Sequence, residues 1–313
     1  VTKAFSRVSL TQNFRKYTLS VQSESIWKSE NMDFRIRCRN HQLPGRCHMS
    51  DCQEISVSRE KLERLFSRYQ NRQWVHPDPL EFLYLYPEKR DREIVGLIAS
   101  SLAYGRVAQI LKSVSTVLER MGTSPFDFVL SSTDSGLEKT FAGFKHRFTT
   151  GKDLVNYLRG VRMVCGHYGS LYNCFMEAYR DQQDTVHEAL CFLVDELRKA
   201  ESRTSNSLLP LPERGSACKR LHLFLRWMVR KDDVDPGGWQ DVSPSKLIVP
   251  LDIHMHRTCS RLRMTARKQG DLKTAMEITH AFRELAPEDP VKYDFVLTRL
   301  GIRNDCDPEE LFG

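Results

Sequence analysis

A carboxylate at the start of a helix is the first candidate for chemistry in this sequence. Asp252 follows the apolar stretch 247–251 and comes directly before residues with helical spacing. An aspartate in that position serves as an N-cap, and its side chain is expected to accept a hydrogen bond from the amide of Met255. A carboxylate fixed beside an apolar wall can also stabilise developing positive charge on a sugar or activate a nucleophile. Asp252 is therefore a candidate catalytic residue that also caps its helix.

A second segment has the features of a phosphate-binding turn. Gly215 and Ser216 follow a proline, and Lys219 and Arg220 stand in the first turn of a helix expected over residues 219–230. Free backbone N–H groups at a helix N-terminus, next to a glycine and to cations, suit a phosphate group. The segment is therefore predicted to bind the backbone of a nucleic acid.

The same helix has two more cations. Arg226 and Arg230 are four residues apart on one face, with Trp227 beside them. Such a face could grip a nucleic-acid backbone, with an aromatic ring available for stacking. An ordinary amphipathic helix explains the arginines equally well, because they would face solvent while the apolar residues face the core: Leu221, Phe224, Leu225 and Met228. Both interpretations stay open at this stage.

Two histidines give a rival interpretation of the segment around Asp252. If residues 247–251 formed a strand, His254 and His256 would share one side of it and could bind the metal of a barrel-fold hydrolase. The alternation of strands and helices that such a barrel requires is missing. On a helix, residues two apart point to different sides and would not share a metal. We therefore expect no metal, and His254 is predicted to contact nucleic acid.

The elements that must position these residues are helices. Apolar residues recur at three- and four-residue steps along most of the chain. Helices are expected over 58–69, 91–111 with Gly105 inside it as a bend, 152–162, 169–180, 185–200, 219–230, 252–264, 271–284 and 290–300. Asp289 as the cap and Pro290 at the first position are expected to start the last of these. The predicted fold class is all-α, with many helices joined by compact loops.

The chain changes character near residue 55. Residues 1–55 lack a sustained apolar period and are predicted to form a poorly ordered extension, followed by an all-α domain over 56–313. The extension contains residue types that suit zinc, at wider spacing than zinc sites usually have: Cys38, His41, Cys47, His48 and Cys52. A cysteine-rich tail is the favoured interpretation of this cluster.

Composition limits the function further. The formal net charge of +7 favours anionic partners, such as nucleic acid, phosphorylated metabolites or an acidic membrane surface. Hydrophobic residues make up 40% of the chain, which excludes disorder throughout. The longest apolar runs are too short to span a bilayer, no signal pattern opens the chain, and the nine cysteines are irregularly spaced. We expect a cytoplasmic (or nuclear) protein with free thiols.

Several of these segments resemble known families. The segment that includes the candidate aspartate is similar to the catalytic-aspartate segment of helix-hairpin-helix DNA glycosylases, especially 8-oxoguanine glycosylases and endonuclease III-type enzymes: Val249-Pro250-Leu251-Asp252-Ile253-His254-Met255, with Arg257 and Arg261-Leu262. The turn with Lys219 precedes the aspartate, in the chain order of their hairpin. Segments 102–106, 215–220, 224–230, 250–252 and 289–295 also resemble a family of mostly bacterial proteins of unknown function, from roughly residue 60 to 302.

The glycosylase resemblance implies a two-lobed helical fold with interleaved lobes, an active cleft between them, and DNA, damaged or abasic, as partner. Asp252 would stabilise an oxocarbenium-like transition state, and Lys219 would attack the sugar and form a Schiff base. Gly215 and Ser216 would bind a DNA phosphate through backbone amides, with Arg220 and Arg257 as further contacts. The target base would be flipped out of the stack. No cofactor is implied.

The sequence also departs from the glycosylase pattern. Glu213 stands where the hairpin, Leu-Pro-Gly-x-Gly, has its first glycine, and Lys219 lies two positions beyond the matching lysine, about half a helical turn. Only Cys306 lies where some relatives carry an iron–sulfur cluster, so no cluster is expected. The leading prediction is a DNA glycosylase or AP lyase. The alternatives are a non-enzymatic nucleic-acid-binding module on the same fold and a metal-dependent hydrolase.

Overall fold

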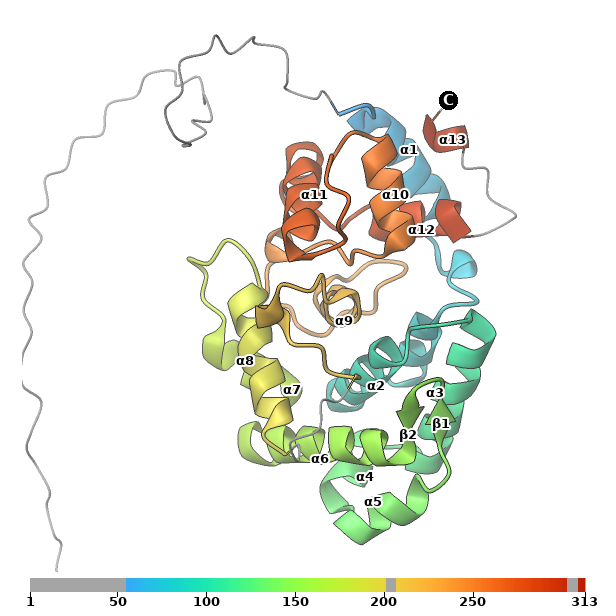
Figure 1. The fold of residues 1–313 in the computed structure, drawn as a ribbon, viewed down its shortest axis with the longest axis vertical. Coiled ribbons are helices and arrows are strands. Elements are labelled where there is room, and N and C mark those ends of the chain that lie inside the picture. Colours follow the sequence, from blue (N-terminus) through green and yellow to red (C-terminus); the bar gives the residue numbers. More distant parts are fainter. Residues whose placement is uncertain (1–54, 201–206, 303–308, 313) are drawn as a thin grey trace, which may run out of the picture. The chain divides into compact units, whose positions relative to one another are not determined.

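Helices make up most of the structure, a computed structural model that describes residues 55–200, 207–302 and 309–312. All of them belong to one unit, Asp51–Gly313. In this described part, the sheet consists of a single antiparallel hairpin of β1 (Lys145–His146) and β2 (Thr149–Thr150) (Figure 1). The prediction of an all-α fold is therefore confirmed. Residues 1–54, with the cysteine and histidine cluster, lie outside the described residues.

Thirteen α-helices follow one another along the part of the chain that the structure describes. The α-helices are α1 (Arg59–Tyr69), α2 (Lys89–Ser101), α3 (Val107–Met121), α4 (Pro125–Ser131), α5 (Asp134–Thr140), α6 (Gly151–Tyr168), α7 (Leu171–Ala178), α8 (His187–Arg198), α9 (Lys219–Val229), α10 (Ile253–Arg261), α11 (Leu272–Leu285), α12 (Asp294–Ile302) and α13 (Glu309–Phe312). Four 3-10 helices join them: η1 (Arg72–Trp74), η2 (Pro79–Leu85), η3 (Pro212–Arg214) and η4 (Pro244–Lys246). None of the described helices is both long and apolar enough to cross a bilayer.

Local side chains set where several helices begin. Ser58 caps α1, Asp271 caps α11, and Thr150 forms a capping box with Asp153 at the start of α6. Each of these side chains accepts a hydrogen bond from a backbone N–H that has no partner inside its helix. The predicted cap at Asp252 is confirmed, because its carboxylate accepts hydrogen bonds from the amides at the start of α10.

The expected long helix over 91–111 is wrong. The chain instead forms α2 and α3, separated by a corner at residues 102–106. Gly105 in this corner has a φ of +100°. This conformation lies outside the helical region, and glycine adopts it without steric cost. The missing Cβ therefore allows a sharp change of direction rather than a bend in a continuous helix.

One expectation in the C-terminal half is also corrected, and so is the strand that the metal-hydrolase alternative required. Helix α12 begins at Asp294 rather than at Pro290, because the Asp289 carboxylate pairs with Arg230 instead of capping a helix. Residues 247–251 are not a strand; the Val249 amide donates to the Thr279 hydroxyl, 3.0 Å away. Helices α4 and α5, which the periodicity did not predict, fill the chain between α3 and the β1–β2 hairpin.

Helix α2 and helix α9 form the centre of the packing that positions the candidate site. They contact each other directly, and α2 also packs against η2, α4 and α7. Apolar residues of α9 are buried, with Trp227 fully enclosed. Trp239, from the loop after α9, lies 5.3 Å from the Phe224 ring and donates its indole N–H to Glu93 on α2. Helix α10 packs against α12. These contacts hold the starts of α9 and α10 in fixed positions.

Candidate active site

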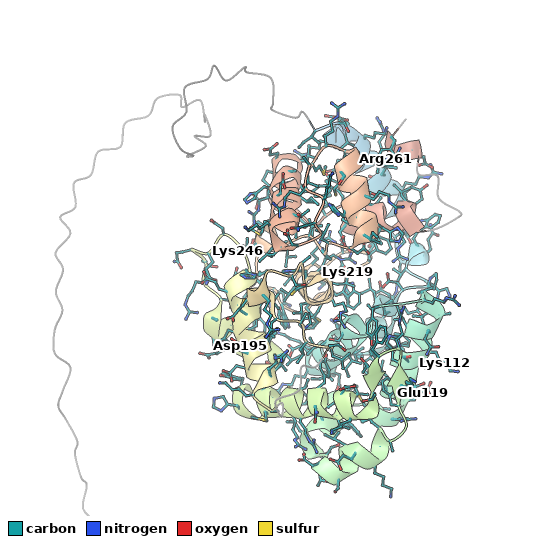
Figure 2. All side chains as sticks on the ribbon, viewed as in Figure 1. Lys112, Glu119, Asp195, Lys219, Lys246 and Arg261 are labelled. Carbon is teal, nitrogen blue, oxygen red and sulfur yellow. The ribbon has the colours of Figure 1, made fainter. Side chains whose placement is uncertain are left out.

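The two residues predicted to be catalytic meet in space. Lys219 is the first residue of α9 and Asp252 is the N-cap of α10, and the lysine Nζ lies 3.0 Å from the aspartate Oδ2. Figure 2 shows Lys219 near the middle of the view, where α9 begins. The side chains are 32% and 21% exposed, so solvent and a ligand can reach both. The half-turn offset of the lysine from the glycosylase pattern therefore does not separate it from Asp252.

The carboxylate of Asp252 uses its two oxygens differently. Oδ1 accepts hydrogen bonds from the amides of His254 and Met255, each 2.9 Å away. Oδ2 faces the Lys219 ammonium. Burial opposes ionisation of this group, but the charge of Lys219 and the amide hydrogen bonds outweigh it, so the pKa of Asp252 lies below its usual value. Asp252 is therefore a carboxylate at neutral pH.

A tight turn places the lysine. After η3, Gly215 has φ +76° and Cys218 has φ +42°, both in the left-handed region. The Gly215 carbonyl accepts a hydrogen bond from the Leu272 amide at 2.9 Å, and Ser216 forms a bridge with Asp271. The turn is thereby attached to the start of α11. A left-handed non-glycine residue such as Cys218 persists only where its surroundings enforce it, as happens at functional sites.

Arg226 and Arg230 do not form the predicted nucleic-acid face. They are only 3% and 5% exposed. Arg226 pairs with Asp235 at 3.0 Å and with Asp294, and Arg230 pairs with Asp289 at 2.8 Å. Both interpretations from the sequence are therefore wrong for these side chains. Both guanidinium groups are buried, and carboxylates from other segments neutralise them inside the protein.

The buried charges extend to the candidate site. Arg230 also pairs with Asp235, and the two arginines with their carboxylates form what we call the ion-pair ladder, whose acidic members are Asp232, Asp235, Asp289 and Asp294. Lys219 and Arg226 are seven residues apart and share a face of α9. Burial raises the pKa of Asp294 and Arg226 opposes this; Asp252 and Lys219 also act on the same carboxyl. The Lys219–Asp252 pair is therefore the exposed end of a charge array along α9.

The other residues predicted to bind nucleic acid differ in whether their side chains face solvent. Arg220 is used within the protein, because its guanidinium donates to the carbonyls of Ser101 and Ser207, each 2.5 Å away. Gly215 is half-buried and Ser216 is exposed beside the site. His254 and Arg257 are exposed on α10. Solvent-facing residues among the predicted set thus lie on the turn before α9 and on α10.

An open basic hollow lies on α10 and the loop that follows it. Its volume is about 670 Å³, and its lining contains no aspartate or glutamate. Five cations line it: Arg257, Arg261, Arg263, Arg267 and Lys268. Ile253, directly after Asp252, lines it too and is 69% exposed. Of these five cations only Arg257 was predicted to contact nucleic acid, although the clustering of cations over residues 257–268 is visible in the sequence.

Comparison with protein-family models gives one match that covers most of the chain. The family described as Protein of unknown function (DUF2400) matches residues 78–303. The chain belongs to this family. The predicted resemblance to a family of unknown function is confirmed, and the matched range includes the corner 102–106, Lys219 and Asp252. Searches of curated proteins and of solved structures gave no match.

The DUF2400 match leaves the chemistry to be argued from the site itself. The metal-hydrolase interpretation required a strand at 247–251, and the structure has none there. On α10, His256 contacts the Arg267 carbonyl through Nε2 at 2.8 Å, while His254 is exposed. Within 55–200, 207–302 and 309–312, no three His, Cys, Asp or Glu residues are arranged to hold a metal. The two histidines of this DUF2400 member therefore do not form the proposed pair.

Proposed function

We propose that this protein acts on nucleic acid and cleaves N-glycosidic bonds through Lys219 and Asp252. The observation that carries the proposal is the 3.0 Å contact between the Lys219 ammonium and the Asp252 carboxylate, from two helix starts 33 positions apart. A lysine nucleophile beside a fixed carboxylate is the pair that a glycosylase with lyase activity needs. On this proposal the fold is of the helix-hairpin-helix glycosylase type, with residues 212–218 as its hairpin.

The chemistry follows from the charges of the pair. The resting ammonium cannot attack a sugar, because its nitrogen has no free electron pair. We propose that it gives one proton to the departing base, which leaves C1′ with the electrons of the glycosidic bond. The Asp252 carboxylate stabilises the positive charge that develops on the sugar. The neutral amine then forms a bond to C1′. A second amine proton passes to the ring oxygen as the bond between C1′ and that oxygen breaks, with its electrons going to the oxygen, and the nitrogen lone pair forms the C=N bond of the protonated Schiff base.

The surroundings of the pair support a polyanionic ligand. The basic hollow begins beside Asp252, since Ile253 belongs to its lining, and the described lining residues include five cations, of which Arg267 pairs with Asp271 at 2.8 Å. Arg257 and Lys268 are exposed there. The formal charge of +7 adds a long-range attraction for phosphates. A nucleic-acid strand in the hollow would bring its sugars toward the Lys219 amine.

Trapping with borohydride tests the proposal. Duplex and single-stranded oligonucleotides with an abasic site or damaged bases would be incubated with the full chain and sodium borohydride, which reduces a Schiff base to a stable covalent adduct. We expect an adduct with the wild type, no adduct with Lys219→Gln, and reduced base release with Asp252→Asn. The control is Lys112→Gln, because Lys112 is exposed on α3.

Two outcomes would contradict parts of the proposal. An adduct that persists in Lys219→Gln but disappears in another lysine variant would assign the nucleophile elsewhere. No adduct and no base release on any substrate would overturn the enzymatic proposal.

A nucleic-acid-binding module without catalysis is the second candidate. The basic hollow favours it, because the hollow requires no chemistry at the Lys219–Asp252 pair. Under this alternative, Lys219 and Asp252 only join two helix starts, and Asp252→Asn leaves nucleic-acid affinity unchanged while no substrate is turned over. Parallel measurement of affinity and trapping on the same variants separates the two candidates.

A further inference from the structure

The β1–β2 hairpin is fastened to the corner between α2 and α3. The Tyr104 hydroxyl donates to the His146 carbonyl at 3.0 Å and lies 2.7 Å from the Thr149 hydroxyl. The His146 ring contacts the Tyr104 carbonyl at 3.1 Å and the Ser113 hydroxyl at 2.9 Å, and it is fully buried. Four side chains, from the corner, from α3 and from the hairpin itself, therefore fix the base of a hairpin whose strands have only two residues each.

Gly105 makes room for the tip of this hairpin. A Cβ at position 105 would lie 2.7 Å from Cδ and 2.9 Å from Nη1 of Arg147. Arg147 itself has φ +50°, an unfavourable conformation for a residue with a side chain. Phe148 is next in the turn, with 79% of its surface exposed. The corner thus holds the hairpin so that an arginine and a bare aromatic ring stand at its tip.

All the charged residues in the two segments that form and border this tip are basic. The exposed cations Arg106, Lys145 and Arg147 lie within segments 102–110 and 143–150, and neither segment contains aspartate or glutamate. The Arg147 guanidinium lies 5.4 Å from the centre of the Phe148 ring. An exposed phenyl ring among cations buries little apolar area in the free protein, so most of its surface is available to a ligand. A nucleotide offers both a flat apolar face and a phosphate.

The tip is also linked to the start of α9. The Arg220 guanidinium, next in sequence to Lys219, lies 5.1 Å from the centre of the Tyr104 ring. Tyr104 in turn lies 4.6 Å from the His146 ring at the base of the hairpin. Direct contacts therefore run from the hairpin to the residue beside the candidate nucleophile. The position of the hairpin is therefore coupled by packing to the start of α9.

We propose that the hairpin tip binds an unpaired nucleotide of a DNA strand, with Phe148 stacked on the base and with Arg106, Lys145 and Arg147 on the phosphates. Stacking on an exposed aromatic ring suits any base, because every base has a π-face. The inference rests on the proposed function only in taking nucleic acid as the ligand. It does not depend on catalysis by Lys219.

Equilibrium binding tests the inference. The full chain would be titrated into a single-stranded oligonucleotide with 2-aminopurine at one position, with anisotropy reporting affinity and 2-aminopurine fluorescence reporting stacking. Phe148→Ala is expected to weaken affinity about 5- to 100-fold and to abolish the fluorescence change, whereas Phe148→Trp retains both. The matched control is Leu85→Ala, because Leu85 is a 69% exposed apolar residue at the end of η2.

The outcomes separate this inference from the proposed function. If the wild type binds and Phe148→Ala binds equally well with an unchanged fluorescence signal, the inference is overturned while the proposed function stands. If the wild type binds none of the oligonucleotides, nucleic acid is not the ligand and both fail. Loss of borohydride trapping in Lys219→Gln tests the nucleophile alone, so that result says nothing against the hairpin.

Discussion

Lys219 pairs with one carboxylate oxygen of Asp252, and the other oxygen of the same carboxylate caps helix α10. Oδ2 faces the ammonium at 3.0 Å, and Oδ1 accepts two amide hydrogen bonds at the start of α10. The role of this aspartate in folding and its proposed role in chemistry are therefore carried by different atoms. Conservative variants can remove one role and keep the other.

Replacement of Asp252 by Asn and by Ala should give different stabilities. Asn caps a helix about as well as Asp, so Asp252→Asn loses only a partly exposed ion pair, less than about 1 kcal/mol. Asp252→Ala also loses the cap and should cost roughly 1 kcal/mol more. Urea unfolding followed by circular dichroism measures both. Equal destabilisation of the two variants would show that the cap contributes nothing.

Removal of one charge from the ion-pair ladder should destabilise the folded protein far more than either substitution of Asp252. Arg226→Met leaves Asp235 and Asp294 buried without their shared cation, which should lower the free energy of unfolding by about 3–5 kcal/mol. Arg257→Met, on the exposed side of α10, should change it by less than about 0.5 kcal/mol. Chemical denaturation measures the free energy of unfolding of both variants. A small effect at Arg226 would mean that the carboxylates are protonated rather than ionised.

Glu93 should make stability depend on pH. Burial raises the pKa of this carboxyl from 4.5 to about 7, although amides of α7 and the Trp239 indole donate to it. The folded protein therefore holds the proton more tightly than the unfolded chain. Its stabilising contribution is full below pH 4.5 and is lost as the pH rises through about 7, by up to about 3 kcal/mol.

Glu93→Gln provides the comparison for this pH effect. The variant has no proton to lose, so its free energy of unfolding should improve relative to wild type between pH 4.5 and pH 8. Denaturation curves at a series of pH values measure the difference. A difference that stays constant across this range would contradict a raised pKa at Glu93.

The basic hollow should govern the salt dependence of nucleic-acid binding. The triple variant Arg257→Gln, Arg263→Gln and Lys268→Gln removes three lining cations. Each lost phosphate contact should reduce the slope of log affinity against log salt by about 0.7–0.9, hence by about 2 in total. Fluorescence anisotropy at several salt concentrations gives the slope. The same slope in the triple variant and in Lys112→Gln would place the phosphates elsewhere.

Alanine at two glycines should have opposite effects. Gly105→Ala forces a side chain into a φ of +100° against Arg147 and should cost about 1–3 kcal/mol. Gly166→Ala, within α6 and with open space at its Cβ, should stabilise by about 0.5–1 kcal/mol. Thermal melts measure both. A neutral Gly105→Ala would show that the corner does not hold Arg147 in place.

Local patterns in the sequence located the candidate pair. Asp252 after an apolar stretch and Lys219 after a proline and glycine turn both carry their signal within a few residues. Most helices were likewise found from apolar spacing, because that spacing reports which face is buried. The distance between Lys219 and Asp252 was not predictable, since it depends on how α9 and α10 are held by the rest of the fold.

The errors share a physical origin in partners from distant segments. Arg226 and Arg230 have the spacing of solvent-facing residues, and only carboxylates up to 68 positions away make their burial tolerable. The β1–β2 hairpin has strands too short to show alternation, and its stability comes from contacts with Tyr104. The neighbouring residues do not determine the φ of Gly105, so the sequence was equally compatible with a bend within one helix and with a break between two helices.

The ion-pair ladder has a consequence for how the chain folds. Arg226 and Arg230 can leave water only together with Asp235, Asp289 and Asp294, which come from two other segments. A state with α9 docked but the segment 289–294 still loose would contain charges without counter-charges in an apolar interior. Such intermediates should be sparsely populated. We expect α9, the loop after it and α12 to assemble in one cooperative step, so that the candidate site is either wholly formed or absent.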